Sequence, residues 1–150
     1  MSSFFATVFP DLQTAEEAQR LIETLNDKHA IKLVSAVVIA KDQSGNITQH
    51  NGRTPGTLGA VMTGLIGGIA GLVGGPAVAI FGAASGALSG GWFDLLRTQD
   101  REIFMNEVAA KVSTSQAALL GEVVNPSDDA KRLVEEQLVS LGGSVINSGS

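Results

Sequence analysis

The sequence predicts an α+β fold: a ferredoxin-like antiparallel sheet with helices on one face, interrupted by an inserted glycine-rich hairpin of two helices. Three observations support this prediction. Both flanks of the chain alternate short apolar runs with amphipathic helical stretches, the flanks read as two strand–helix–strand halves, and the middle of the chain carries no charge. The predicted parts are a first half of the α+β domain (1–53), the hairpin (54–93) and a second half (94–150).

The first flank predicts a strand, a helix, a central strand and a hairpin arm. Residues 4–9 form an apolar run that ends at a proline. Thr14 and Glu17 have the spacing of a capping box, which predicts a helix from there to about Lys28. Residues 33–40 are rich in valine and isoleucine and predict a central strand, which a turn connects to an arm at 47–50.

The second flank predicts helix, strand, helix and strand. Thr98 is a candidate N-cap for the first helix, and residues 117–124 form the next apolar run. Pro126 predicts the start of the second helix, and Gly142 or Gly143 is suited to its left-handed C-terminal cap. A last strand is then expected over residues 144–147.

Composition excludes several classes of protein. Hydrophobic residues make up 44% of the 150, which is too many for a disordered chain. The absence of cysteine excludes disulfides, thiolate metal sites and cysteine nucleophiles. The net charge of -5 has the wrong sign for binding a phosphate backbone, so nucleic acid is not an expected partner.

The middle segment is set apart by its lack of charge and its glycine content. Residues 1–53 carry eleven charged side chains and residues 94–150 carry fourteen, whereas residues 54–93 carry none. Pro76 follows two glycines and divides the segment into two arms, for which antiparallel helices are expected. Glycines that recur at every fourth residue give each arm a flat strip for close helix contact. The predicted contact residues are Gly64, Gly67, Gly68, Gly71, Gly75, Gly82, Gly86 and Gly90.

Three interpretations of this segment differ in what surrounds it. A flexible linker would not carry so many leucine, isoleucine and valine residues. A membrane hairpin fits the length, because about 18 residues rising about 1.5 Å each reach roughly 27 Å. Its interface anchors would be Arg53, Trp92, Arg97 and Arg101. In the third interpretation the protein is in aqueous solution and other copies of the chain cover the hairpin, since a large apolar surface does not stay exposed on a soluble monomer.

Four stretches together resemble a known but uncharacterised family. Residues 56–60, 82–90, 117–120 and 142–146 are similar to a bacterial and archaeal domain of unknown function that is labelled a predicted membrane protein. The resemblance extends over nearly the whole chain and implies a glycine-rich hairpin between two halves of an α+β domain. It implies no activity and no catalytic residues. Family members often have an acidic pair at the start of the helix after the hairpin, from which residues 98–101 depart.

No pattern of catalytic or metal-binding residues stands out. The glycines are not followed by the lysine of a phosphate-binding loop, nor do they fit a dinucleotide fold. His29 and His50 stand alone beside polar turns and predict surface positions rather than metal ligands. The acidic pairs at 128–129 and 135–136 suit the first turn and the solvated face of a helix. We therefore expect a non-enzyme without a cofactor.

The function predicted from these patterns is self-assembly. The hairpin is expected to pack with hairpins of other copies in or at the cytoplasmic membrane, with the flanking domain facing the cytoplasm because no signal peptide is apparent. Its partners would be other copies of the chain and the lipid bilayer. One alternative is a cytosolic assembly, closed or filamentous. Another is a small-molecule-sensing module that uses the sheet face, although Ser35, Gln49 and His50 are too few polar residues to define a pocket there.

Overall fold

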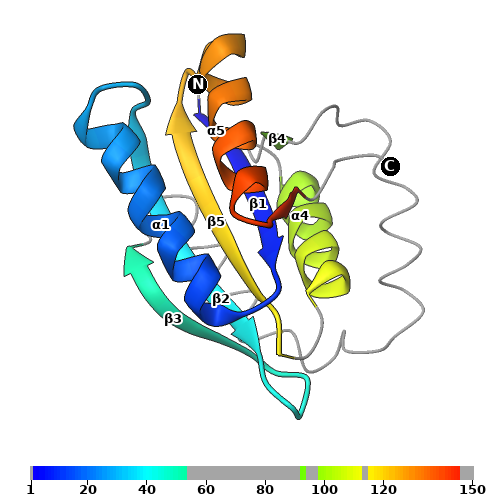
Figure 1. The fold of residues 1–150 in the computed structure, drawn as a ribbon. Coiled ribbons are helices and arrows are strands. Elements are labelled where there is room, and N and C mark those ends of the chain that lie inside the picture. The colour runs from blue at the N-terminus through cyan, green and yellow to red at the C-terminus, as the bar shows by residue number, and fades with distance from the viewer. Residues whose placement is uncertain (1, 54–91, 94–97, 113–114, 146–150) are drawn as a thin grey trace.

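The structure is a computed structural model that describes residues 2–53, 92–93, 98–112 and 115–145 (Figure 1). All eight predicted contact glycines and Arg97 lie outside these residues, so the predicted hairpin is described only at its last two positions. The described elements are, in chain order, β1 (Ser2–Phe9), α1 (Leu12–Asp27), β2 (Leu33–Lys41), β3 (Ile47–Arg53), β4 (Trp92–Phe93), α4 (Thr98–Lys111), β5 (Ala117–Val124), α5 (Asp128–Ser140) and β6 (Ser144–Val145).

The strands form one antiparallel sheet in the order β3-β2-β5-β1-β4, and β6 also pairs with β1. Because β1 and β2 are both antiparallel to β5, they are parallel to each other with β5 between them. In the same way β5 and β6 lie on either side of β1. Two split strand–helix–strand units are therefore interleaved, as in a ferredoxin-like sheet. This confirms the predicted α+β class.

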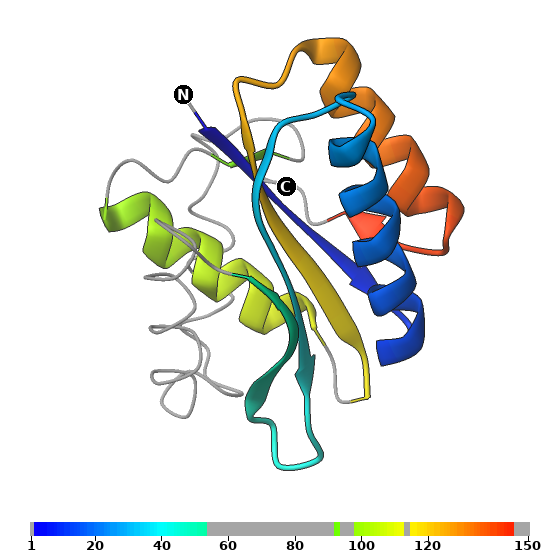
Figure 2. The same cartoon turned by 90° about the vertical axis from the view of Figure 1, so that its left-hand side faces the viewer.

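The helices cover both faces of the sheet, which differs from the expectation of one covered face. Figure 2 shows α1 and α5 on one side of the strands and α4 on the other. The reason lies in the central strands, where consecutive residues such as Leu119 and Leu120 are both fully buried and point to opposite faces. A sheet that is apolar on both faces needs a cover on each. The prediction of one face holds for α1 and α5 but not for α4.

Each face has its own hydrophobic core. The α1/α5 face is packed around Phe5, Phe9 and Ile22, and the α4 face around Phe4, Phe93 and Phe104. The rings of Phe93 and Phe104 meet edge to face with centroids 4.8 Å apart. Strands β1, β2 and β5 each contribute alternate side chains to both cores.

Helix ends agree with the sequence at α5 and differ at α1. Asp11 is the N-cap of α1 and accepts a hydrogen bond from the Thr14 amide at 2.8 Å, so the helix begins before the predicted capping box. This hydrogen bond lowers the pKa of the Asp11 carboxyl. At the end of α5, Gly142 has a φ of 92°, and the Gly143 amide donates to the Leu138 carbonyl at 3.1 Å. That is the expected left-handed cap.

Candidate functional site

One charged residue lies inside the most buried strand of the sheet. Strand β5 has the sequence AALLGEVV, and its only charged side chain, Glu122, is 8% exposed. Alternation places Leu119 and Val123 on the α1/α5 face, and therefore Leu120 and Glu122 on the α4 face. A carboxylate inside an apolar strand has lost most of its hydration and needs compensating partners.

The residues beside Glu122 are set by the strand register. Ser35 of β2 lies directly opposite Glu122 on one side, and Phe4 of β1 lies opposite on the other. Directly opposite residues of antiparallel strands point to the same face, so Ser35 and Glu122 stand side by side on the α4 face. Ser35 is fully buried. We call these two residues the Glu122–Ser35 pair.

Neither member of the pair is satisfied by the part of the chain that the structure describes. Glu122 Oε1 and Ser35 Oγ are both buried and have no hydrogen-bond partner. Native proteins pair the large majority of buried side-chain polar atoms, so each exception requires an explanation. The strand register therefore places two buried oxygens without a described partner next to each other on the α4 face.

The helix on this face is also acidic and polar where it is buried. Asp100, Asn106 and Glu107 of α4 are each no more than 5% exposed, and Asn106 Oδ1 is a further buried oxygen without a partner. At the far end of the helix, Lys41 Nζ donates to the Ala109 carbonyl at 2.7 Å. Burial lowers the pKa of Lys41. The buried residues of α4 therefore include two acidic side chains and one amide.

Trp92, one of the predicted membrane-interface anchors, is buried in the sheet domain. It lies in β4, is 7% exposed and contacts Phe5 edge to face, with ring centroids 5.2 Å apart. Its indole nitrogen donates to Glu135 Oε1 of α5 at 2.9 Å. The expected aromatic anchor is therefore part of the α1/α5 core, because β4 pairs with the edge of β1 and turns Trp92 inward.

The other expected anchors are spread over the fold. Arg53 is the last residue of β3, and Arg101 lies in the first turn of α4. Arg53, Ala36, Gly121, Phe5 and Trp92 occupy one row across the sheet. With strands about 4.8 Å apart, the two ends of the uncharged segment are attached roughly 19 Å from each other, at opposite edges of the sheet.

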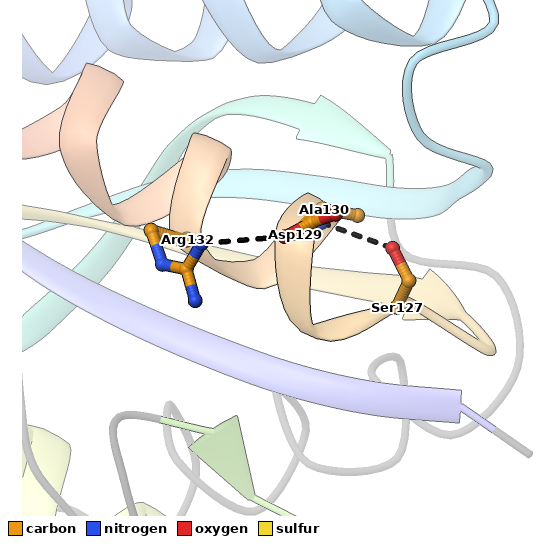
Figure 3. A network of polar contacts seen from close by, with 4 residues as sticks. All are labelled: Ser127, Asp129, Ala130 and Arg132. Carbon is orange, nitrogen blue, oxygen red and sulfur yellow. Dashed lines mark hydrogen bonds and ion pairs between the residues drawn. The ribbon is translucent and has the colours of Figure 1, made fainter.

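A groove of about 460 Å³ lies where the loop after α1 meets the loop before α5. His29, Lys32 and Asn125 line it, and His29 and Asn125 have positive φ values of 62° and 42°. Ser127 at its wall caps α5 by accepting from the Ala130 amide at 3.1 Å (Figure 3). His29 is exposed, in agreement with the sequence prediction, and so is His50.

Figure 3 also shows the ion pair of the first turn of α5, in which Arg132 and Asp129 are 3.2 Å apart and largely exposed. Two acidic residues, Asp128 and Asp129, already occupy this helix start. They compensate the positive end of the helix dipole, as the sequence predicted. The positive end of the α5 dipole beside the groove is therefore already compensated by these two residues and does not favour an anion there.

The polar candidates of the sheet face are separated by the structure. Gln49 and His50 are exposed on the edge strand β3, where His50 Nε2 is 2.9 Å from Thr48 Oγ1. Ser35 lies inside the fold beside Glu122. Sequence reasoning did not single out Glu122, although one acidic residue within a seven-residue apolar background was a visible signal.

Within the described residues, no group of three or more histidine, aspartate and glutamate side chains is placed to hold a metal ion. None of the helices in the described ranges is long and apolar enough to cross a membrane. No protein-family model, curated protein or solved structure matches the chain.

Proposed function

We propose that the protein is a non-enzymatic, self-assembling protein that oligomerises through its uncharged glycine-rich segment at the cytoplasmic membrane. The observation that carries the proposal is the forty-residue stretch without charge, 54–93, in which glycines recur at helix-contact spacing. In this proposal the segment makes the contacts between copies. The role of the sheet domain is to hold the two ends of the segment, at opposite edges of the sheet.

The architecture of the sheet domain supports this division of roles. Both faces of the sheet are covered by helices from the flanks, and the members of both core clusters among the described residues come from the flanks and β4. We expect these residues to form a complete core. A domain that completes its own core does not need the segment for folding. The segment is therefore available for contacts with other copies.

The distribution of apolar surface supports it as well. Among the described residues with an assigned exposure, Val139 is the one large hydrophobic side chain that is exposed, at 53%. A single exposed side chain does not make an association surface. The apolar area that assembly requires is thus expected from the uncharged segment.

Gly86→Leu tests the glycine strips directly. Leucine should separate the helix backbones and abolish assembly, although it favours a helix by nearly 1 kcal/mol relative to glycine. Gly86→Ala should give an intermediate result because a methyl group adds less bulk. Light scattering at matched concentration measures the size of the three proteins, and circular dichroism measures their helicity.

An intact assembly in Gly86→Leu together with raised helicity would mean that the glycines are not contact residues. Fractionation of native cells separates the membrane form of the proposal from the cytosolic one. Recovery in the membrane fraction supports the first. Recovery as a large soluble particle supports the alternative, a closed or filamentous cytosolic assembly.

A further inference from the structure

We propose that the groove between the loop after α1 and the loop before α5 binds a small monocarboxylate with an apolar body, of the aliphatic or aromatic carboxylic acid class. The groove has a volume of about 460 Å³, which is within the usual range for small-molecule sites. It lies in a different part of the molecule from the uncharged segment, and binding there does not depend on assembly.

The polar side chains on the α1 side of the groove offer hydrogen-bond donors and positive charge. Lys32 and His29 line the groove, are exposed, and have no hydrogen-bond or ion-pair partner for their side chains among the described residues. Asn26 Oδ1 already accepts from the Leu33 amide at 3.0 Å, so the N–H groups of the Asn26 amide are the part that remains for a ligand. Donors of this kind, one of them an ammonium, fit the two oxygens of a carboxylate.

The described lining of the groove contains no acidic side chain, although the chain has a net charge of -5. The carbonyls of Thr24, Leu25 and Asn26 at the end of α1 accept hydrogen bonds from amides of the following loop, so these acceptors are already used. The attraction for an anion comes from this α1 side, since Asp128 and Asp129 compensate the dipole of α5 on the other side.

The rest of the lining is apolar and suits a hydrocarbon chain or ring. Ile31 is buried, and Pro126 and Ala130 are partly buried on the α5 side. An inorganic anion would leave this apolar surface in contact with water. A carboxylic acid with an apolar body covers it and places its charge beside Lys32 and His29.

Both loops are held in place without a ligand. The Val124 amide donates to the Lys32 carbonyl at 2.9 Å and joins the two sides of the groove. In the described part of the chain, His29, Ser115 and Asn125 are the non-glycine residues with positive φ, and two of these three line this groove, one in each loop. Side chains kept at backbone positions that favour glycine are a recurrent feature of ligand sites.

The first test is isothermal titration calorimetry of the full chain with sodium benzoate, which should bind saturably and with equimolar stoichiometry. Benzamide has the same shape without the charge, and acetate has the charge without the ring, so each should bind about tenfold more weakly than benzoate. Sodium chloride at equal ionic strength should give no saturable heat. No saturable binding of benzoate, or binding of benzamide or acetate as tight as that of benzoate, would overturn the proposal.

The second test locates the site. Lys32→Gln removes the ammonium from the lining and should weaken benzoate binding about tenfold. Lys28→Gln makes the same change in net charge at an exposed position of the same loop that does not line the groove, and is the matched control. Because solvent screens an exposed charge, this control should bind benzoate within about twofold of the parent. Unchanged binding by Lys32→Gln, or an equal loss in both variants, would contradict the assignment.

His29→Gly separates a binding role from a structural one. Glycine removes the strain of the positive φ and should raise Tm by roughly 2 to 4 °C, while loss of the ring should weaken benzoate binding. A histidine that only stabilises the loop would give the opposite result, a lower Tm with unchanged affinity for benzoate. That result would overturn the proposal.

Discussion

Replacing Phe5 by alanine is expected to lower the free energy of unfolding by about 4 kcal/mol, which is a large part of the usual 5 to 15 kcal/mol. Phe5 is 2% exposed in the central strand β1, and its ring lies over Gly121 of β5 and against Trp92. Removal of the ring leaves a cavity that both neighbours border. Chemical denaturation followed by circular dichroism measures the loss.

Gly121 provides the matched second change. A methyl group there would overlap the Phe5 ring, so Gly121→Ala alone should cost about 2 kcal/mol by overpacking. In the Phe5→Ala background the same methyl group enters the cavity and should cost little. The two substitutions are therefore expected to be less than additive by about 1 to 2 kcal/mol. Additive losses would show that the ring does not pack on Gly121.

Trp92→Ala should also cost about 3 to 4 kcal/mol, because it empties the position between Phe5 and α5 and removes a hydrogen bond to Glu135. Trp92→Phe keeps a ring and should lose about 1 to 2 kcal/mol. Denaturant unfolding of the two variants by circular dichroism measures the difference. A membrane-interface tryptophan would behave in the opposite way, since its removal would weaken lipid partitioning and leave the stability of the sheet domain unchanged.

The sequence was sufficient for the elements whose signals are local. Apolar runs located β1, β2 and β5, and Gly142 marked the end of α5, because strand alternation and left-handed caps depend on neighbouring residues. The placement of α4 was not local. That helix buries residues around much of its circumference, including Asn106 and Glu107. Its sequence therefore has no single apolar stripe from which the covered face of the sheet could be predicted.

The candidate site required long-range register. Ser35 and Glu122 are 87 positions apart, and only the pairing of β2 with β5 brings them together. The inward turn of Trp92 had a similar origin. Strand β4 has two residues, which is too short for a periodic signal, and its pairing with Phe4 and Phe5 decides where the indole lies.

The central claim is that the sheet domain folds by itself and that the uncharged segment assembles copies of the chain. Replacing residues 54–91 by a Gly-Ser linker tests both parts. A linker of about 12 residues has an end-to-end distance of roughly 19 Å, which matches the separation of Arg53 from Trp92 across the sheet. A linker of about two residues leaves three Cα–Cα steps between Arg53 and Trp92, which reach at most roughly 11 Å, and should disrupt β3 or β4.

The deciding measurement is light scattering of the full chain and of the 12-residue-linker protein at the same concentration, combined with thermal unfolding. The linker protein is expected to be a monomer that unfolds cooperatively, with Trp92 shielded from water in its fluorescence spectrum, while the full chain forms a larger species. A linker protein that assembles to the same copy number as the full chain, or that does not fold, would contradict the claim.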